Sequence, residues 1–166
     1  AGPDLFLGPH EMAKVLHGDR VAARESGLDR RGRPEGKIVE VLTHLKNAGY
    51  DFLADLTATD EGGSPRFEVV YNLYAMKTKG PRIRVKARVG ENEDLPSAIP
   101  VWKGADWAER EVFDMSGVRF RGHPDLRRIL LPADWEGHPL RKDHVVQEFY
   151  HGVKVDSEPV SKPPQS

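Results

Sequence analysis

The chain has 166 residues, with 25 basic and 26 acidic side chains and no cysteine. At roughly 100 to 200 residues per domain, this length predicts one domain with an appended tail and excludes two full catalytic domains. The net charge of −1 argues against a general binder of nucleic acid or anionic lipid. Without a thiolate, the chain cannot form a disulfide, a cysteine nucleophile or a cysteine-ligated zinc or iron–sulfur site.

The sequence predicts no membrane span. The longest segments free of Asp, Glu, Lys and Arg, residues 69–76 and 95–102, hold eight residues each, whereas a spanning helix needs about 20 apolar residues. The first residues, AGPDLFLG, lack the basic leader and long apolar stretch of a secretory signal, so we expect no signal there.

Two helices are expected in the first fifty residues. The first covers residues 9–17 and ends at Gly18, and the second begins near Pro34 and ends at Gly49. A short strand over residues 21–23 and an exposed polar loop, GLDRRGRPEG, separate them. Their apolar stripes are Met12, Val15 and Leu16 in the first helix and Ile38, Leu42 and Leu45 in the second.

Alternating apolar residues predict three strands, over residues 50–59, 67–76 and 82–89. The expected inward sets are Phe52, Ala54, Leu56 and Ala58; Phe67, Val69, Tyr71, Leu73 and Ala75; and Ile83, Val85, Ala87 and Val89. The short turns DEGGSP and KTKGP favour an antiparallel meander whose apolar face the two preceding helices cover. The expected fold class is therefore α+β, an antiparallel three- to four-stranded sheet covered by helices, with an extended C-terminal segment.

A third helix is expected in GADWAEREVFDMSG, after a loop, ENEDLPSA. Asp106 and Glu109 have the spacing of a capping box, and Gly117 ends the helix. The last fifteen residues hold three prolines and no periodic apolar face. We expect a globular domain over residues 1–117, a charged docking segment over 118–151 and an extended or disordered tail over 152–166.

Residues 109–143 hold seven basic and seven acidic side chains, and six of the seven basic ones are arginines. The planar guanidinium grips carboxylates through two bonds and tolerates partial burial. This balance predicts a lattice of ion pairs, either within the chain or across an interface. An ion pair between Arg110 and Asp114 suits their helical spacing.

The same segment contains two related turns, GHPDLRR and GHPLRKD. In each turn the proline disfavours a helical conformation for the preceding histidine, His123 or His138. The simplest interpretation is two stiff turns whose histidines bond to nearby backbone. A metal site drawn from His123, His138, His144 or His151 is the alternative, although no HExxH-type spacing supports it.

The string EREVFDMSGVRFRGHPDLRRILLPADWEGHPLRKD, residues 109–143, closely resembles the hallmark segment of the C subunit of NADH:quinone oxidoreductase, respiratory complex I. Similar proteins are the J subunit of the photosynthetic relatives and a component of some membrane-bound hydrogenases. Upstream, FLADLTATD and FEVVYNLY also resemble the family's strands, so the resemblance covers residues 38–143. Where family members have an apolar strand before the second helix, this chain has LDRRGRP.

The resemblance implies a non-catalytic structural and assembly subunit in the peripheral arm of the proton-translocating enzyme, on the cytoplasmic side of the bacterial membrane or its organelle equivalent. It implies docking on the D subunit, which holds the quinone site, near the B and I subunits. Separately, the prolines and the lack of a core of its own predict that the stretch 144–166 lies along a partner. Iron–sulfur clusters and FMN would belong to neighbouring subunits, and the chain has no GxGxxG or P-loop of its own. The expected interface residues are Glu109, Arg110, Glu111, Asp114, His123, Arg127, Arg128, His138, Arg141, Lys142 and Asp143.

Three alternatives use the same residues differently. The chain could be the equivalent subunit of a related hydrogenase or photosynthetic complex. An independent hydrolase or lyase would use Glu109, Glu111 and Asp114, but the nearby arginines favour ionised carboxylates and oppose acid–base work. A nucleic-acid module would use a basic strand face with one aromatic: Arg82, Arg84, Lys86, Arg88 and Tyr74. No RNP-like aromatic pattern accompanies that face, so we expect no nucleic-acid partner.

Overall fold

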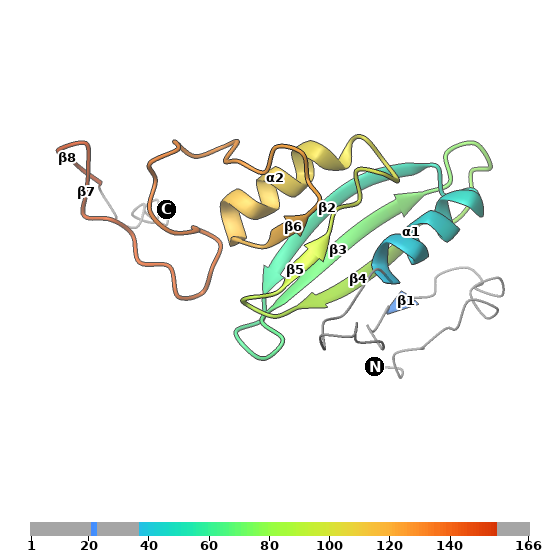
Figure 1. Cartoon of the computed structure of the whole chain (residues 1–166), viewed down its shortest axis with the longest axis horizontal. Coiled ribbons are helices and arrows are strands. Elements are labelled where there is room, and N and C mark those ends of the chain that lie inside the picture. The colour runs from blue at the N-terminus through green and yellow to red at the C-terminus, as the bar shows by residue number, and fades with distance from the viewer. Residues whose placement is uncertain (1–20, 23–36, 156–166) are drawn as a thin grey trace, which may run out of the picture.

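The computed structural model describes residues 21–22 and 37–155 (Figure 1). In these ranges two helices lie over the twisted main sheet, and the C-terminal segment runs beyond one end of that sheet. The helix expected over residues 9–17 and the polar loop before α1 fall outside the described residues. The first described helix is α1 (Lys37–Asn47), which corresponds to the helix expected between Pro34 and Gly49.

The main sheet has four strands in the order β1, β4, β3, β2. The expected antiparallel meander is formed by β2 (Phe52–Asp60), β3 (Phe67–Tyr74) and β4 (Ile83–Val89). The short edge strand β1 (Val21–Ala22) pairs with β4 and runs parallel to it. The predicted α+β class is confirmed, and the edge strand adds one parallel pairing to the antiparallel sheet.

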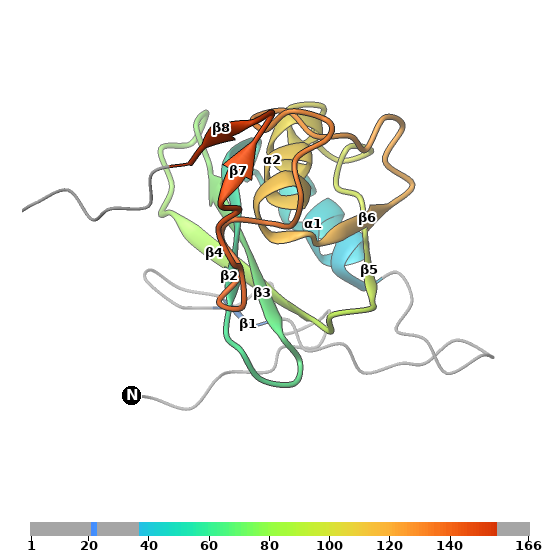
Figure 2. The ribbon, with the colours of Figure 1, turned by 90° about the vertical axis from the view of Figure 1, so that its left-hand side faces the viewer.

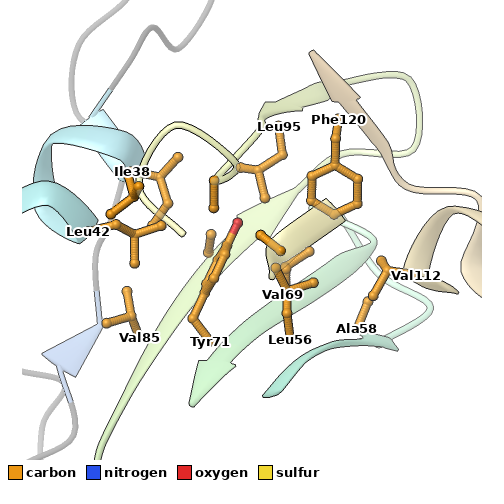
Figure 3. Close-up of a cluster of buried hydrophobic side chains, with 14 of the residues drawn as sticks. Ile38, Leu42, Leu56, Ala58, Val69, Tyr71, Val85, Leu95, Val112 and Phe120 are labelled. Atoms are coloured by element: carbon orange, nitrogen blue, oxygen red, sulfur yellow. The ribbon is translucent and has the colours of Figure 1, made fainter. Parts of the chain in front are cut away.

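One face of this sheet forms the core. The alternation predicted for β3 and β4 is confirmed, because every second residue is buried in both strands. The predicted stripe of α1 is confirmed as well, since Ile38, Leu42 and Leu45 are each at most 4% exposed. Figure 3 shows Ile38 and Leu42 pointing into the same cluster as Tyr71 and Val85 of the sheet.

The two covering helices are α1 and α2 (Ala105–Ser116), which lie on the same side of the sheet (Figure 2). Ala105 and Val112 of α2 belong to the buried cluster. The helix α2 follows the sheet in sequence and covers its face beside α1, an addition to the prediction. The other helix expected to cover the sheet, 9–17, lies outside the described residues, so its role stays a prediction. Gly117 has φ +78° and ends α2, as predicted.

Strand β2 departs from simple alternation at Ala54. Its pairing with β3 shifts register just after Leu53, which marks a β-bulge, and one extra residue exchanges the two faces of a strand. Leu56 and Ala58 face the core as predicted, but Phe52 is 48% exposed and Leu53 packs against the core. The prediction that Phe52 and Ala54 share the buried face is wrong for this reason.

A second, small sheet takes one of its two strands from residues 91–98, where the sequence predicted a loop. In it β5 (Asp94–Pro96) pairs in parallel with β6 (Arg119–Arg121), so the two strands flank α2 in the sequence. Val118 and Phe120 are buried in the core. The core thus continues past residue 117, where the domain boundary was expected.

Near the C-terminus, β7 (Phe149–Tyr150) and β8 (Val153–Lys154) form an antiparallel hairpin. Asp134 ties this hairpin to the preceding segment, because its two carboxylate oxygens lie 3.0 Å from the Tyr150 hydroxyl and 2.7 Å from His151 Nε2. The hairpin crosses the expected boundary between residues 151 and 152. The rest of the predicted tail, 156–166, lies outside the described residues.

Candidate docking surface

Asp114 organises the chain that follows β6. The backbone N–H groups of Ile129, Leu130 and Leu131 donate to its Oδ2 at 3.0, 2.8 and 2.9 Å, and Arg128 Nη1 donates to its Oδ1 at 2.7 Å. Burial, the largest influence, acts to raise the pKa of Asp114, but these four donors outweigh it and the pKa is lowered. A buried carboxylate therefore fixes three consecutive loop amides.

Arg128 completes this arrangement from the loop side. Besides the Asp114 carboxylate, it donates to the carbonyl oxygens of Asp114 at 3.2 Å, Trp135 at 2.9 Å and Gly137 at 2.8 Å. Its side chain is only 16% exposed. The guanidinium therefore bonds within the chain and links α2 to both Gly-His-Pro turns.

The expected ion pair between Arg110 and Asp114 is wrong. Arg110 Nε donates to the carbonyl of Arg127 at 3.2 Å, and its Nη2 donates to the carbonyl of Arg128 at 3.1 Å. Asp114 turns inward to Arg128 instead. Helical spacing allowed the local pair, but the loop supplied better partners to both residues.

The second Gly-His-Pro turn caps the C-terminal end of α2. The last carbonyls of a helix lack partners within the helix and must find donors elsewhere. Three consecutive carbonyls are satisfied here: His138 Nδ1 donates to Asp114 at 2.9 Å, the Leu140 N–H to Met115 at 2.9 Å and Arg141 Nε to Ser116 at 2.7 Å. This turn is therefore part of the helix terminus, and not a free loop.

Gly117 allows that close approach. A Cβ added there would lie 2.3 Å from Arg141 Nη2 and 2.6 Å from His138 Cδ2, and the positive φ disfavours other residues as well. Burial, its largest influence, lowers the pKa of His138. A neutral imidazole suits a site shared with the cationic Arg141.

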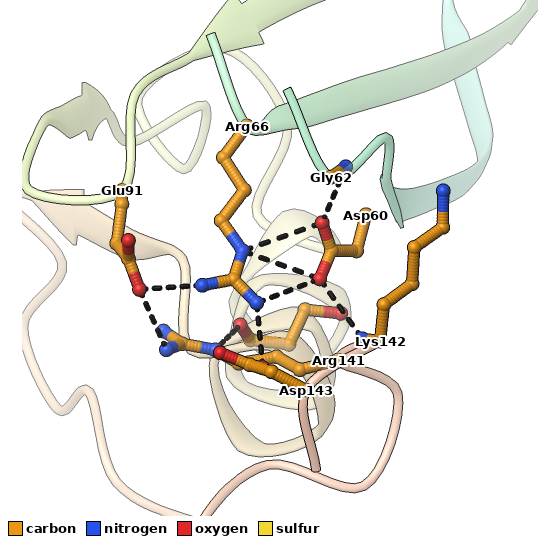
Figure 4. Close-up of polar contacts among 8 residues, drawn as sticks. Asp60, Gly62, Arg66, Glu91, Arg141, Lys142 and Asp143 are labelled. Carbon is orange, nitrogen blue, oxygen red and sulfur yellow. Dashed lines mark hydrogen bonds and ion pairs between the residues drawn. The ribbon is translucent and has the colours of Figure 1, made fainter. Parts of the chain in front are cut away.

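A second group of contacts holds residues 141–143 at the end of the main sheet (Figure 4). Arg66 Nη2 lies 2.9 Å from Asp60 Oδ2 and 2.6 Å from Asp143 Oδ1, and the Lys142 N–H donates to Asp60 Oδ2 at 3.0 Å. Glu91 lies 2.5 Å from Arg66 Nη1. The bond from Arg66 holds the pKa of Asp60 well below its usual range, and the pKa of Arg66 is raised in return.

The histidines of the two turns bond to backbone, which confirms the simplest interpretation. His123 Nδ1 accepts the Asp125 N–H at 3.0 Å, and its Nε2 faces the Asp106 carbonyl at 3.2 Å, so Nε2 carries the proton. His138 bonds to the Asp114 carbonyl. Within residues 21–22 and 37–155, no three His, Asp or Glu side chains gather as a metal site requires.

Glu109 lies in the interior. The Ala98 N–H donates to its Oε1 at 2.5 Å and the Ser97 hydroxyl to its Oε2 at 2.7 Å, while burial raises its pKa. The expected capping box is wrong, because α2 begins after Gly104 and no side chain caps it. Glu109 and Asp114 were both expected at the partner interface. In the folded chain, however, their side chains are 0% exposed, so neither is available for direct contact with a partner.

The other expected interface residues divide into two groups. His123, His138, Arg128, Arg141 and Arg110 are partly buried in the contacts described above. Exposed members are Glu111, Arg127, Lys142 and Asp143. Arg127 is 70% exposed and pairs locally with Asp125 at 2.7 Å. The predicted lattice of ion pairs is therefore largely internal, and an interface role for the exposed members stays a prediction.

Sequence reasoning missed the exposed apolar side chains of this region. Of nine large apolar side chains exposed in the described ranges, six lie between residues 130 and 153, where the sequence shows no period that would bury them. They are Leu130, Leu140, Val145, Val146, Phe149 and Val153. An exposed apolar patch is typical of a protein interface, and these six side chains share one segment of the chain. The sequence could have indicated them, because apolar residues in a segment without helical or strand periodicity have no face that would bury them.

The basic side chains on or next to β4 contact residues of the neighbouring strand β3. The Arg82 guanidinium lies 4.6 Å from the centre of the Tyr74 ring, and Lys86 pairs with Glu68 at 2.5 Å. Arg88 lies 3.8 Å from the same Glu68 carboxylate. A nucleic acid would have to displace these contacts, so the geometry does not favour that alternative.

Residues 33–150 match the protein family described as "Respiratory-chain NADH dehydrogenase, 30 Kd subunit". The chain belongs to this family. A second family, "Ribonuclease B OB domain", matches only residues 1–41, most of which lie outside the described ranges. The resemblance found in the sequence is confirmed, because the family match covers the whole charged segment.

Relatives in this family are named as the C subunit of NADH-quinone oxidoreductase. The protein of Chloroherpeton thalassium is 50% identical over 158 residues, which cover 89% of this chain and 65% of the relative. That of Chlorobium phaeobacteroides is 48% identical over 158 residues, covering 90% of this chain and 94% of the relative. The chain thus spans just under two thirds of the first relative and nearly all of the second.

A third relative, from Bdellovibrio bacteriovorus, is a longer protein that is named as the C/D subunit of NADH-quinone oxidoreductase. It is 48% identical over 113 residues, which cover 67% of this chain and 20% of the relative. These names identify family members as subunits of an oxidoreductase complex, complex I. No helix in the described part of this family member is both long and apolar enough to cross a bilayer.

Proposed function

We propose that the chain is a non-catalytic structural and assembly subunit of the peripheral arm of a proton-translocating NADH:quinone oxidoreductase. It docks on the D subunit, which holds the quinone site, near the B and I subunits, on the cytoplasmic side of the membrane. One observation carries this proposal: the name of the Bdellovibrio relative joins C and D, and this chain matches a fifth of that protein. Two subunits joined in one chain stay close together, which favours a direct contact between them.

The geometry of the segment after α2 supports this role. The Asp114 and Asp60 contacts fix its backbone at two places, on α2 and on the main sheet. Apolar side chains nevertheless remain exposed along it. A segment that is rigid but leaves apolar surface uncovered suits docking on another protein.

The buried carboxylates support a non-catalytic role. General acid–base work requires a carboxyl group that can reach the substrate. Both oxygens of Glu109 and both oxygens of Asp114 already accept hydrogen bonds inside the chain, and neither side chain is exposed. Under this proposal electrons reach quinone through neighbouring subunits.

The proposal assigns no redox group to this chain, and places the iron–sulfur clusters and FMN in its neighbours. A cluster would need cysteine thiolates, and the sequence has none. Metal analysis and a visible spectrum of the purified, folded chain test this directly. Stoichiometric iron or a flavin band would contradict it.

Replacing Arg128 by Ala in cells tests the assembly role. The change removes a cationic donor from the buried Asp114 carboxylate and takes a donor from three carbonyls, so we expect fewer assembled complexes with near-normal quinone-reductase activity per complex. The matched control is Arg119→Ala, since Arg119 is exposed, pairs with Asp94 at 2.8 Å and is not among the expected interface residues. Normal amounts of complex with turnover lowered about ten-fold, or 1.4 kcal/mol in the barrier, would contradict the proposal.

A further inference from the structure

The arginines of the charged segment are already satisfied within the chain. Arg128 bonds to the Asp114 carboxylate and three carbonyls, and Arg110 bonds to two carbonyls. Arg141 bonds to the Ser116 carbonyl and lies 3.4 Å from Glu91. Turning any of them toward a partner would break these bonds, several of which are partly buried, and that loss offsets what the new bond contributes. These arginines are therefore poor sources of docking energy.

Two leucines close to these arginines in the chain have side chains that, unlike those of the arginines, are largely exposed. Leu130 is 61% exposed and Leu140 is 60% exposed, although both are large and apolar. Their backbones are nonetheless fixed by neighbouring residues of α2, because the Leu130 N–H donates to Asp114 and the Leu140 N–H to Met115. Both exposed side chains therefore belong to residues whose backbones are fixed near the C-terminal end of α2.

We propose that the docking surface is apolar: Leu130 and Leu140 are its anchors, and they insert into an apolar surface of the D subunit. This inference rests on the proposed function, since it names the chemistry of the same contact. Because the hydrogen bonds of Asp114 and Met115 already order both backbones, docking loses little loop entropy. The dense charge of residues 109–143 then shapes the surface and does not attract the partner.

Salt separates an apolar contact from a charged one. Raising the salt from about 0.1 M to about 1 M shortens the screening length from about 10 Å to about 3 Å, which weakens attraction between exposed charges. Burial of apolar surface does not depend on that screening. An apolar docking surface thus predicts an affinity that changes little with salt, even though the segment is rich in charge.

The experiment measures the dissociation constant of the full chain for a purified subcomplex of the D and B subunits, at both salt concentrations. Leu130→Ser and Leu140→Ser should each weaken binding about ten-fold or more, equivalent to 1.4 kcal/mol. Two controls should bind like the wild type: Arg119→Ala, which removes an exposed charge of the segment that is not among the expected interface residues, and Met76→Ser, which removes an apolar side chain 59% exposed in the turn after β3. Thermal unfolding of all four variants verifies that each remains folded.

The outcomes distinguish this inference from the proposed function. Salt-insensitive binding that the leucine variants weaken supports the apolar surface. Wild-type binding that weakens about ten-fold in high salt, or leucine variants that bind normally, overturns it while docking on the D subunit stands. A wild-type chain that binds the subcomplex at neither salt concentration overturns the proposed function, and this inference with it.

Discussion

The guanidinium of Arg66 joins Asp60, the last residue of β2, to Asp143 in the C-terminal segment, at 2.9 and 2.6 Å. Asp60 is almost fully buried, whereas Asp143 is largely exposed. One arginine from the turn before β3 therefore links the main sheet to the segment proposed to dock (Figure 4). The same segment is held at α2 by Asp114, so its two attachments lie on different parts of the core.

Asp60→Asn should lower the free energy of unfolding by roughly 1 to 3 kcal/mol at neutral pH, since a charged donor loses its carboxylate. The pKa of Asp60 is lowered in the folded chain, mainly by the bond from Arg66. A carboxyl group with a lowered pKa stabilises the fold above its unfolded pKa, about 3.9, and this contribution is lost as the pH falls below that value. The difference in unfolding free energy between the wild type and Asp60→Asn, measured by urea unfolding, should therefore become smaller below about pH 4.

Asp143→Asn is the matched control for that experiment. It removes the exposed partner of the same guanidinium and leaves the buried one in place. We expect a clearly smaller loss of stability, because exposed ion pairs contribute little. Equal losses from both variants would mean that burial of Asp60 does not decide the strength of this contact.

Much of the main sheet could be predicted because burial follows the period of the strand. The inward sets of β3 and β4 were predictable for that reason. The bulge at Ala54 was not, since an extra residue leaves the apolar pattern of β2 unchanged while it reverses the faces. β5 and β6 have three residues each, too few for a period to appear.

The charged segment was located by sequence, but its pairings were not. Arg110 and Asp114 have ideal helical spacing, yet each bonds to the loop after β6. Asp60 and Arg66 stand in no motif, and only the folded chain brings them to Asp143. Partner choice among many charges depends on tertiary structure, which local spacing does not contain.

Gly117→Ala should destabilise the chain more than Gly122→Ala. Both glycines have similar positive φ values, +78° and +83°, so both changes introduce backbone strain of at least about 1 kcal/mol. Only at Gly117 would the new Cβ also meet Arg141 and His138, whereas Gly122 has open space within 4 Å. The difference in unfolding free energy between the two variants measures the close approach alone. Equal destabilisation would show that Arg141 and His138 move aside freely.

Glu109→Gln should stabilise the chain at neutral pH relative to the wild type. Burial raises the pKa of Glu109, so the fold favours the protonated carboxyl group. The stability that this protonated group contributes is fully present below the pKa of the unfolded chain, about 4.3, and is lost as the pH rises through the folded pKa. A glutamine keeps an acceptor for the Ala98 N–H and offers a donor to Ser97 without a buried charge.

Urea unfolding at several pH values tests this prediction. Wild-type stability should fall with rising pH relative to the glutamine variant. Glu109→Ala is the contrasting change, because it leaves a cavity and two unpaired groups and should be destabilising by about 2 kcal/mol or more. A glutamine variant less stable than wild type at neutral pH would show that the carboxylate is favourable in this site.

Asp114→Asn should loosen the docking segment before it loosens the core. The backbone N–H groups of residues 129–131 all donate to Asp114 Oδ2, so their hydrogen exchange in the isolated chain should accelerate when that oxygen becomes part of an amide. The overall loss of stability should be roughly 1.5 to 3 kcal/mol, the range for hydrogen bonds to charged groups. The amides of β3 should remain the more slowly exchanging ones, since they form hydrogen bonds within the sheet.

Asp125→Asn provides the control for the exchange measurement. Asp125 also accepts from an arginine of this segment, Arg127 at 2.7 Å, but both side chains are largely exposed and no consecutive amides depend on it. Exchange at residues 129–131 should stay at the wild-type rate in this variant. If Asp114→Asn also leaves those amides protected, the carboxylate does not order the segment, and the rigid presentation of Leu130 must come from Arg128 and its carbonyl partners alone.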